Sequence, residues 1–480
     1  MPSTDVRFEF QGALAQAVGP LNGLTSAEWA ALGGETTAIV RRLNETPPET
    51  PYRNVSTDEK LTQVKKVLAV ARRAKGEFDD VVVLGIGGSA LGTIALRTAL
   101  KPPYWNMLSA EGRKGLPRLW VMDNVDPAEF RAMTELIDPH RTLFIVISKS
   151  GETGETLSQF LVTMDLVRDC VGDDDWRRHF IIITEPAQPG KANVLREAAT
   201  SLELESFEAF PKLGGRWSVL SPVGLLPAAL IGIDVEGLLR GAGDMVKRCT
   251  REDFSTNPAA QGAAVQIGLY RKGKPMSVMM AYAAALKDVA DWYRQLWAES
   301  LGKVCAGGTF VGPTPIKALG VTDQHSQVQL YRQGPADKVF TILSVEDYGD
   351  DVKFPALKDV PKGFDFLKGR TMKDLFRAEE RATLWALAGV SQRPVTKIVV
   401  PQVTARNIGG LLMMLMVQTS LAGAMLGIDA YDQPGVEAGK HAAMALLGAA
   451  GTISNHLAKG LPADCKTYEI LRRRIESSPV

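Results

Sequence analysis

Short apolar runs alternate with stretches of helical periodicity between Asp80 and Pro186. The runs are VVVLGIGGS, LWVMDN, FIVISKS and FIIITEP, and they are separated by segments such as AEFRAMTELI and ETLSQFLVTMDLVRD. Buried strands connected by amphipathic helices are typical of a parallel sheet that has helices on both faces. This pattern predicts an α/β fold for the first part of the chain.

A second pattern of the same kind runs from about Asn257 to Asp429. Its candidate strands are PMSVMMAY, FTILSVE and TKIVVPQV, and its candidate helices include LKDVADWYRQLWAESLG and ARNIGGLLMMLMVQTSLAGAML. The stretch FPKLGGRWSVLSPVGLLP between the two patterns is rich in Gly and Pro, which indicates a structured connection. The segment from Asp347 to Gly369 is rich in Asp, Lys and Pro, and it predicts a surface excursion.

Composition narrows the classes of function. The 480 residues carry 55 Lys and Arg against 54 Asp and Glu, so the formal net charge is +1. Such a chain has no overall field that attracts nucleic acid or an anionic membrane, so an anionic ligand must be held locally. The two longest apolar stretches, SPVGLLPAALIGI and IGGLLMMLMVQTSLAGAMLGI, contain prolines or polar residues and are expected to be buried core helices.

Cysteine usage favours a reducing compartment. The four cysteines, Cys170, Cys249, Cys305 and Cys465, form no CxxC pair, so they signal neither a zinc site nor a disulfide framework. The first residues, MPSTDVRFEF, lack the basic and apolar regions of a secretory signal. We therefore expect a cytoplasmic protein.

Two loops at predicted strand ends have the composition of an anion site. In GIGGSALG, from Gly85 to Gly92, missing side chains let the backbone approach a ligand, and Ser89 adds a hydroxyl. In SKSGET, the hydroxyls and one ammonium come from Ser148, Lys149, Ser150 and Thr153. Because ligands of open α/β sheets bind beyond the carboxyl ends of the strands, we expect the two loops to bind a phosphate group.

Two other interpretations of these loops remain open. Either loop alone could be a capped turn in which Ser or Thr satisfies helix N–H groups. Gly85, Gly87 and Ala90 also fit the dinucleotide fingerprint GxGxxG/A, and Asp123 ends the next predicted strand. That aspartate lies well beyond the spacing of ~20 residues typical of a ribose-binding acid, and a lone glycine fingerprint is a weak signal.

Later segments contain groups suited to proton transfer. Arg216 follows two glycines in GGRWS, Glu299 stands beside small residues in QLWAESLGK, and His325 lies in the polar segment TDQHSQVQL. The segment YDQPGVEAGK adds polar groups beside a Pro-Gly turn, namely Gln433, Glu437 and Lys440. Considered alone, each has a plainer interpretation: Arg216 fits a surface ion pair, Glu299 a solvent-facing helix position and His325 a structural histidine. YDQPGVEAGK alone fits a helix start with an exposed Glu-Lys pair. The motifs HExxH, GxSxG and Walker A do not occur in the sequence, which removes several enzyme classes.

Taken in order, these segments resemble the phosphoglucose isomerase family. LGGRWSVLSPVGL is similar to the family's first signature and DAYDQPGVEAGK to its second, and the match spans about Gly85 to Lys440. The resemblance implies two sugar isomerase domains, each a flavodoxin-like αβα sandwich with a parallel sheet, wrapped by helical terminal segments. The implied boundaries are 1–54 for the N-terminal segment, 55–240 and 241–430 for the two domains, and 431–480 for the C-terminal helical segment.

The resemblance also implies which residues hold the substrate. The residues that hold the phosphate group are Gly88, Ser89, Ser148, Lys149, Ser150 and Thr153. Gln295 and Gln433 contact the sugar. No metal ligand is implied.

Catalytic roles are implied for four further residues. Glu299 matches the base that moves a proton between carbon 2 and carbon 1, and Arg216 stabilises the negative charge of the cis-enediol intermediate. His325 and Lys440 match the residues that open the sugar ring, with Glu155 orienting the histidine.

The implied reaction interconverts glucose 6-phosphate and fructose 6-phosphate in glycolysis and gluconeogenesis, without a cofactor. The resemblance implies a homodimer in which the histidine comes from the partner subunit, with no nucleic-acid or membrane partner. A non-catalytic sugar-phosphate sensor on the same fold is a second hypothesis, but it has no need of Glu299, Arg216, His325 and Lys440 together. A nicotinamide-dependent dehydrogenase based on GIGGSA is a third.

Overall fold

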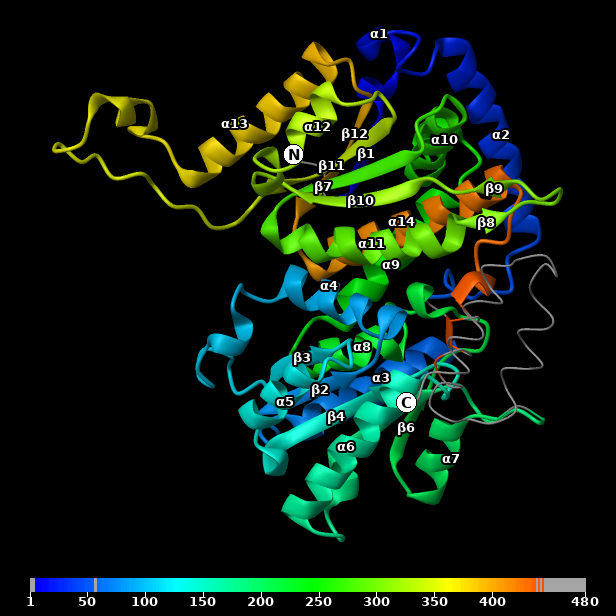
Figure 1. Ribbon diagram of the computed structural model, residues 1–480, viewed down its shortest axis with the longest axis vertical. Coiled ribbons are helices and arrows are strands. Elements are labelled where there is room, and N and C mark those ends of the chain that lie inside the picture. Colours follow the sequence, from blue (N-terminus) through cyan, green and yellow to red (C-terminus); the bar gives the residue numbers. More distant parts are fainter. Residues whose placement is uncertain (1–4, 56–57, 191, 437–438, 441–442, 444–480) are drawn as a thin grey trace, which may run out of the picture. The chain divides into compact units, whose positions relative to one another are not determined.

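The computed structural model describes residues 5–55, 58–190, 192–436, 439–440 and 443. The chain divides into two compact units, Met1–Ala430 and Tyr431–Val480. The described part of the second unit includes the short 3-10 helix Pro434–Val436. Two five-stranded sheets form the framework of the first unit (Figure 1).

The first sheet is parallel throughout, with the strand order β3-β2-β4-β5-β6. Its strands are β2 (Asp80–Leu84), β3 (Arg118–Met122), β4 (Thr142–Ile147), β5 (Phe180–Thr184) and β6 (Glu205–Glu208). Every residue of β2, β4 and β5 is buried. Strands that are covered on both faces need apolar side chains on both faces, which explains their continuous runs of Val, Ile and Phe.

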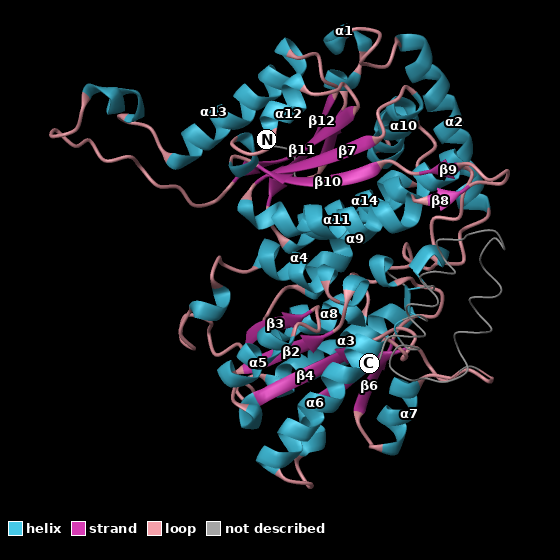
Figure 2. Ribbon diagram, viewed as in Figure 1, coloured by secondary structure: helices cyan, strands magenta, loops and turns pink. Residues whose placement is uncertain are grey.

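Helices cover both faces of this sheet (Figure 2). They are α3 (Asp58–Ala74), α4 (Leu91–Leu100), α5 (Pro127–Leu136), α6 (Gly154–Val171), α7 (Val194–Ser201) and α8 (Pro222–Leu230). On one face Val82, Phe144 and Ile182 share a core with Phe160 of α6 and Leu195 of α7. The helices α3, α4 and α8 pack together on the opposite side.

The second sheet has the strand order β10-β7-β11-β12-β1. Its strands are β1 (Arg7–Glu9), β7 (Met276–Tyr282), β10 (Thr314–Leu319), β11 (Lys338–Asp347) and β12 (Val395–Gln402). Four of these strands are parallel, and β1 pairs with β12 in the antiparallel direction. A separate two-stranded ribbon joins β8 (Lys303–Val304) to β9 (Phe310–Val311).

Helices also cover both faces of the second sheet. They are α2 (Ser26–Glu45), α9 (Val235–Cys249), α10 (Pro258–Arg271), α11 (Lys287–Leu301), α12 (Val328–Gln333), α13 (Met372–Leu384) and α14 (Ala405–Leu426). One face packs against α12 and α13, where Phe340 and Ile342 meet Tyr331 and Phe376. The other face lies against α11 and α14.

The two sheets are wound in the same way. If β2 and β7 are taken as the first strands, both sheets have the order second, first, third, fourth: β3-β2-β4-β5 and β10-β7-β11-β12. This is the flavodoxin-like order, whose ligand crevice lies beyond the carboxyl ends of the first and third strands. The predicted α/β class with two parallel, flavodoxin-like sheets is therefore confirmed, except that β1 adds an antiparallel edge to the second sheet.

The two long apolar stretches form buried helices, as the sequence predicts. All residues of α8 are buried. Among the described residues, α14 is the one helix long and apolar enough to cross a membrane, and 94% of its most apolar window lies inside the structure. A helix that is apolar all round is expected in a protein core, and α14 packs there against α9, α10 and α11.

An exposed arm lies between β11 and α13. Residues 348–371 extend away from the second sheet (Figure 1), and the side chains of Phe364 and Phe366 are 52% and 67% exposed. The predicted surface excursion at Asp347–Gly369 is confirmed.

Three strands of the two five-stranded sheets are not predicted by the apolar pattern. β6 is mostly exposed, β10 mixes buried and exposed positions, and β1 has only three residues. The segment 1–54, predicted as an N-terminal segment, contains the edge strand β1 as well as α2. The predicted domain boundary between residues 240 and 241 falls inside α9.

Helices α9 and α14 cross at a contact that requires glycine. A methyl group on Gly241 of α9 would overlap the carbonyl oxygen of Arg406 and lie 2.6 Å from its carbonyl carbon. Gly243, in the same helix, is a matched control because its methyl group would meet only the Val55 side chain at 3.8 Å. We expect Gly241→Ala to lower the free energy of unfolding by about 1–3 kcal/mol. We expect Gly243→Ala to leave it equal or raise it by up to about 1 kcal/mol.

Urea unfolding followed by circular dichroism measures both variants. Equal midpoints for the two variants would contradict the proposed crossing contact.

Candidate active site

The two predicted anion loops lie side by side at the carboxyl edge of the first sheet. One loop follows β2 and contains the 3-10 helix η2 (Gly87–Ser89), and the other follows β4, which pairs with β2. A methyl group on Gly85 would lie 3.3 Å from the carbonyl oxygen of Ile147, the last residue of β4. This is the edge between the first and third strands, where the flavodoxin-like order places a ligand.

Hydroxyl groups and a helix N-terminus meet in the SKSGET loop. Ser148 is buried, and its Oγ lies 2.8 Å from Thr153 Oγ1 and accepts a hydrogen bond from the Gly151 amide at 3.1 Å. Thr153 occupies the N-cap position of the 18-residue helix α6, but its side chain makes no capping hydrogen bond. The loop therefore offers hydroxyls at the positive end of a helix dipole, a suitable environment for an anion.

Lys149 is anchored by Thr184, the last residue of β5, and by Glu185, which follows it. Its carbonyl oxygen accepts hydrogen bonds from the Glu185 amide at 3.2 Å and from Thr184 Oγ1 at 3.3 Å. Its ammonium lies 3.5 Å from Glu185 Oε1, and the Glu185 side chain is only 5% exposed. Glu185 is not among the residues predicted from the sequence. Its position directly after β5, at the same edge of the sheet as the two anion loops, is the sequence feature that could have indicated it.

A third glycine-containing loop closes against the first. A methyl group on Gly88 would overlap the carbonyl carbon of Gly215 and lie 2.5 Å from the Arg216 nitrogen, so the two backbones are in direct contact. On the same loop, a methyl group on Gly87 would lie 2.9 Å from Gln295 Nε2 of α11. These contacts bring the GGRWS segment and α11 next to the anion loops.

A buried guanidinium and a half-buried carboxylate form the chemical centre of this region. Arg216 Nη1 donates to Glu299 Oε2 at 3.2 Å, and the two side chains are 1% and 32% exposed. Arg216 also donates from Nε to Ser300 Oγ at 2.7 Å and from Nη2 to the Ala430 carbonyl at 2.8 Å. Gln295, one turn before Glu299 on α11, donates to Glu299 Oε1 at 2.9 Å. This arrangement places a fixed cation beside a carboxylate that solvent can reach.

His325 stands on a separate, firmly held loop of the second sheet. It is exposed and directly follows the 3-10 helix Thr322–Gln324 after β10. In the described part of the chain, no hydrogen bond or ion pair joins its side chain to Glu299 or Arg216. Gln324 accepts a hydrogen bond from Tyr282 at 2.7 Å and donates one to Glu379 at 2.8 Å, so the neighbouring residue anchors the loop.

Asp323 anchors the same loop from its other side. It accepts hydrogen bonds from the Leu319 amide and the Ser326 hydroxyl. Partial burial alone would raise the pKa of Asp323, but the hydrogen bonds from Gln327, Ser326 and Leu319 outweigh it and hold the pKa below its usual value.

Three other candidate residues stand on α6 or in the second unit. Glu155 is in the first turn of α6 and is half-buried. Gln433 and Lys440 belong to the unit Tyr431–Val480 and are exposed there. Glu437, noted in the same motif, lies outside the described residues.

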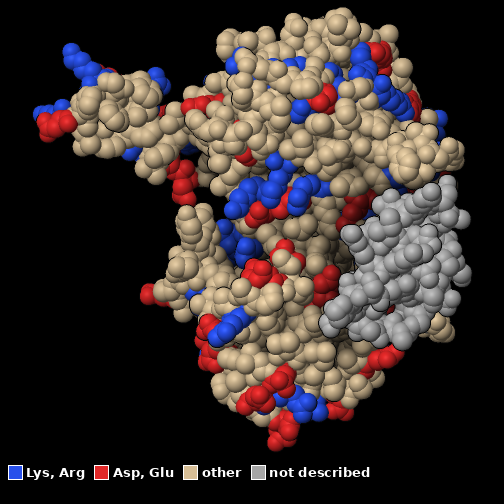
Figure 3. Space-filling model, viewed as in Figure 1, with Lys and Arg blue, Asp and Glu red and all other residues tan. Residues whose placement is uncertain are grey.

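Charged side chains of both signs lie on the surface beside α11. On the face shown in Figure 3, Lys and Arg side chains gather over α11 and α4, although the formal net charge is +1. Arg294 of α11 and Lys317 of β10 are half exposed and both pair with Asp291, at 2.8 and 2.9 Å.

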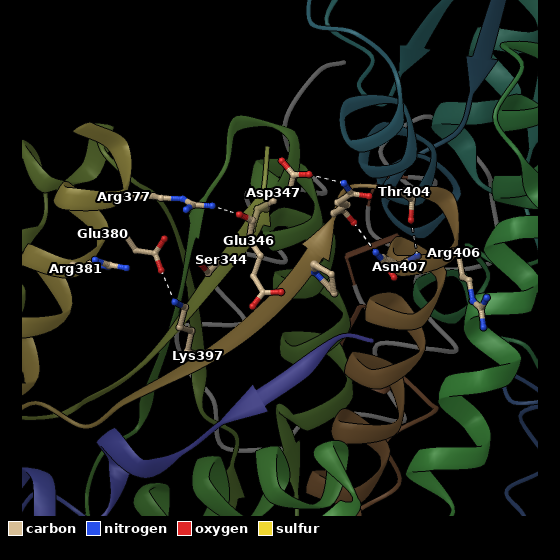
Figure 4. Close-up of a pocket in the computed structure, with 13 residues that line it drawn as sticks. Ser344, Glu346, Asp347, Arg377, Glu380, Arg381, Lys397, Thr404, Arg406 and Asn407 are labelled. Atoms are coloured by element: carbon tan, nitrogen blue, oxygen red, sulfur yellow. Dashed lines mark hydrogen bonds and ion pairs between the residues drawn. The ribbon is translucent and has the colours of Figure 1, made fainter. Parts of the chain in front are cut away.

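A polar cavity of about 790 Å³ lies elsewhere, at the carboxyl ends of β11 and β12 (Figure 4). Its charged groups are largely satisfied by protein partners: Lys397 pairs with Glu380 at 2.8 Å, and Arg406 with Asp244 at 2.7 Å. Asp347 accepts hydrogen bonds from the Gly349 amide and from Gln402, which lower its pKa. The region around Arg216 and Glu299 is the better candidate for chemistry, because Gly87 and Gly88 of the first anion loop contact Gln295 and the Arg216 backbone there. No cluster of three or more metal-ligating side chains occurs among the described residues.

The fold and the site define an α/β protein with adjoining anion loops beside a carboxylate–guanidinium pair. The family model of phosphoglucose isomerase matches residues 58–458. The glucose-6-phosphate isomerase of Carboxydothermus hydrogenoformans is 45% identical over 399 residues, covering 82% of this chain and 83% of that protein. That of Rubrobacter xylanophilus is 40% identical over 449 residues, covering 93% and 99%. This chain therefore belongs to the phosphoglucose isomerase family.

Solved structures have the same fold. A hypothetical protein from Thermus thermophilus aligns with a TM-score of 0.80 and 33% identity over 92% of this chain and all of that one. A glucose-6-phosphate isomerase from Chlamydia trachomatis aligns with a TM-score of 0.75 and 21% identity, covering 93% and 88%. The second likeness supports the fold alone. The predicted fold of two sugar isomerase domains is confirmed.

The backbone contact at Gly88 should be essential to the site. We expect Gly88→Ala to separate the loop after β2 from the Gly215–Arg216 backbone, because its methyl group has no free space. Gly154→Ala, at the first residue of α6 after the second anion loop, is the matched control, since no atom lies within 4 Å of its added methyl group. Hydrogen–deuterium exchange should become faster in peptides covering residues 85–90 and 213–218 of the Gly88 variant only. Unchanged exchange in that variant would contradict the contact.

Proposed function

We propose that this chain catalyses the reversible interconversion of glucose 6-phosphate and fructose 6-phosphate. Family membership supports the reaction, and the relatives named above carry the name of that enzyme. The single observation that carries the assignment of residues is the ion pair between Glu299 and Arg216 beside two anion loops.

The phosphate group is assigned to the carboxyl edge of the first sheet. Its ligands in this proposal are Gly88, Ser89, Ser148, Lys149, Ser150 and Thr153. The phosphate does not react, so binding energy gained there positions the sugar for chemistry at carbons 1 and 2. Gln295 would contact the sugar from α11, and Gln433 is assigned the same task from the second unit.

Proton transfer is assigned to Glu299. A carbon–hydrogen bond next to a carbonyl is a weak acid, so the reaction requires a carboxylate placed at the proton and a cation placed where the enediolate charge develops. Glu299 can take the proton from carbon 2 and return it to carbon 1, so no electrons leave the sugar. Arg216 would stabilise the enediolate oxygen from its buried position next to that carboxylate.

Ring opening is assigned to His325 and Lys440, with Glu155 orienting the histidine. In the described part of its own chain, no hydrogen bond or ion pair joins His325 to Glu299 or Arg216. An exposed, firmly held histidine loop suits a contribution to a neighbouring subunit, so we propose a homodimer with shared active sites.

A cytoplasmic location is part of the same proposal. Cys170, Cys249 and Cys305 are free thiols in the described structure, which suits a reducing compartment. Burial raises the pKa of Cys249 to about 12, so that thiol is unreactive at neutral pH.

The proposed base can be tested directly. We expect the purified chain to convert fructose 6-phosphate to glucose 6-phosphate in an assay coupled to glucose-6-phosphate dehydrogenase. Glu299→Gln should lower kcat by about 10²–10⁴-fold because the amide cannot accept the proton, with KM changed little. Glu236→Gln, an exposed glutamate in the first turn of α9, is the control and should keep full activity. Unchanged turnover in Glu299→Gln would remove this residue as the base.

Sharing of the active site can be tested by subunit mixing. We expect Glu299→Gln and His325→Gln to be nearly inactive when purified separately. If the histidine comes from the partner, unfolding and refolding the two together should restore about a quarter of wild-type activity, because half of the random dimers contain one intact site. The same assay on each variant refolded alone is the control. No recovery in the mixture would place the two residues in one chain's site.

A further inference from the structure

We propose that Ser300 is a positioning residue that fixes the Arg216 guanidinium for the developing enediolate charge. The proposal rests on the isomerase function assigned above. Its basis is the short hydrogen bond from Arg216 Nε to Ser300 Oγ, 2.7 Å long and fully buried. In the sequence, Ser300 is only one of the small residues beside Glu299.

The guanidinium is held at three separate nitrogens. Nε donates to Ser300, Nη2 donates to the Ala430 carbonyl at 2.8 Å, and Nη1 donates to Glu299 at 3.2 Å. A planar group with three donors in use cannot rotate or slide without losing one of these bonds. Since Arg216 is buried, each lost bond leaves a charged donor away from water, which is costly.

Ser300 links the position of the cation to that of the base. It directly follows Glu299 on α11 and is 0% exposed, whereas the Glu299 side chain is 32% exposed. The ammonium of Lys303 donates to the carbonyl oxygens of Glu299 and Ser300, at 2.7 and 3.1 Å, and so fixes the last turn of the helix. The last turn of α11 therefore fixes the positions of both the Glu299 carboxylate and the Ser300 hydroxyl that accepts the hydrogen bond from Arg216.

A hydroxyl is the right kind of acceptor at this position. Ser300 Oγ and the Ala430 carbonyl are both neutral, so they orient the guanidinium without cancelling its charge. A carboxylate in place of Ser300 would pair with the cation, and an alanine would leave Nε without this acceptor. Of the three partners named here, only Glu299 carries a charge.

Steady-state kinetics of Ser300→Ala, with fructose 6-phosphate as substrate, tests the proposal. We expect kcat to fall by about 10- to 100-fold while KM stays within about twofold, because a misplaced arginine affects the charged intermediate more than the bound sugar. Ser344→Ala, a buried serine of β11, is the control and should keep wild-type kinetics. Ser300→Cys preserves the volume with a much weaker acceptor, so it should show a similar loss even if the alanine variant folds poorly.

Two further measurements separate positioning from a general structural role. A hydroxamate that mimics the enediolate should bind Ser300→Ala more weakly by about the same factor as kcat falls, whereas a hexitol 6-phosphate should bind as it does to wild type. In the background Arg216→Lys, which has no Nε donor, adding Ser300→Ala should change kcat less than about twofold.

Several outcomes would overturn the proposal. They are wild-type kinetics in both Ser300 variants, equal weakening of the two inhibitors, or losses that multiply in the double variant. An inactive wild-type chain would overturn the proposed function together with this assignment, whereas an active wild type with unimpaired Ser300 variants would overturn this assignment alone.

Discussion

The candidate site depends on the direct backbone contact between Gly88 and the Gly215–Arg216 segment. The anion loops belong to the first sheet, and the carboxylate belongs to α11, which packs against the second sheet. A small ligand can contact both the anion loops and the carboxylate only if the backbones of the loop after β2 and of the Gly215–Arg216 segment pack closely. A side chain at position 88 would separate these two segments. The absence of a side chain there therefore keeps the proposed phosphate site close to the proposed base.

The two sheets share a winding order but differ in chemistry. After β2 and β4, the chain has glycines and hydroxyls, whereas after β7 and β11 the corresponding edge holds Tyr282 and Tyr348. Tyr348 donates to the Tyr282 carbonyl at 2.8 Å, and burial raises the pKa of both phenols. The corresponding edge of the second sheet lacks the glycine and hydroxyl loops of the first, so the fold alone does not create a phosphate site.

The sequence supports most of the fold and much of the site, for identifiable reasons. Long apolar strands such as β4 and all-apolar helices such as α14 carry a strong local signal. The three residues of β1 carry almost no local signal, because the pairing of β1 with β12 depends on tertiary contacts. Motif residues such as Glu299 could be named from their surroundings. Ser300 and the Ala430 carbonyl could not, because neither a buried serine nor a backbone oxygen has a distinctive pattern.

The antiparallel pairing of β1 has a consequence for how the protein is made. Arg7 pairs with Val399, so β1 leaves the ribosome long before its partner strand β12 is synthesised. Until then the second sheet has an open edge, which another chain's strand could occupy. Completion of this edge is a long-range event, which would make it a late step in biosynthetic folding.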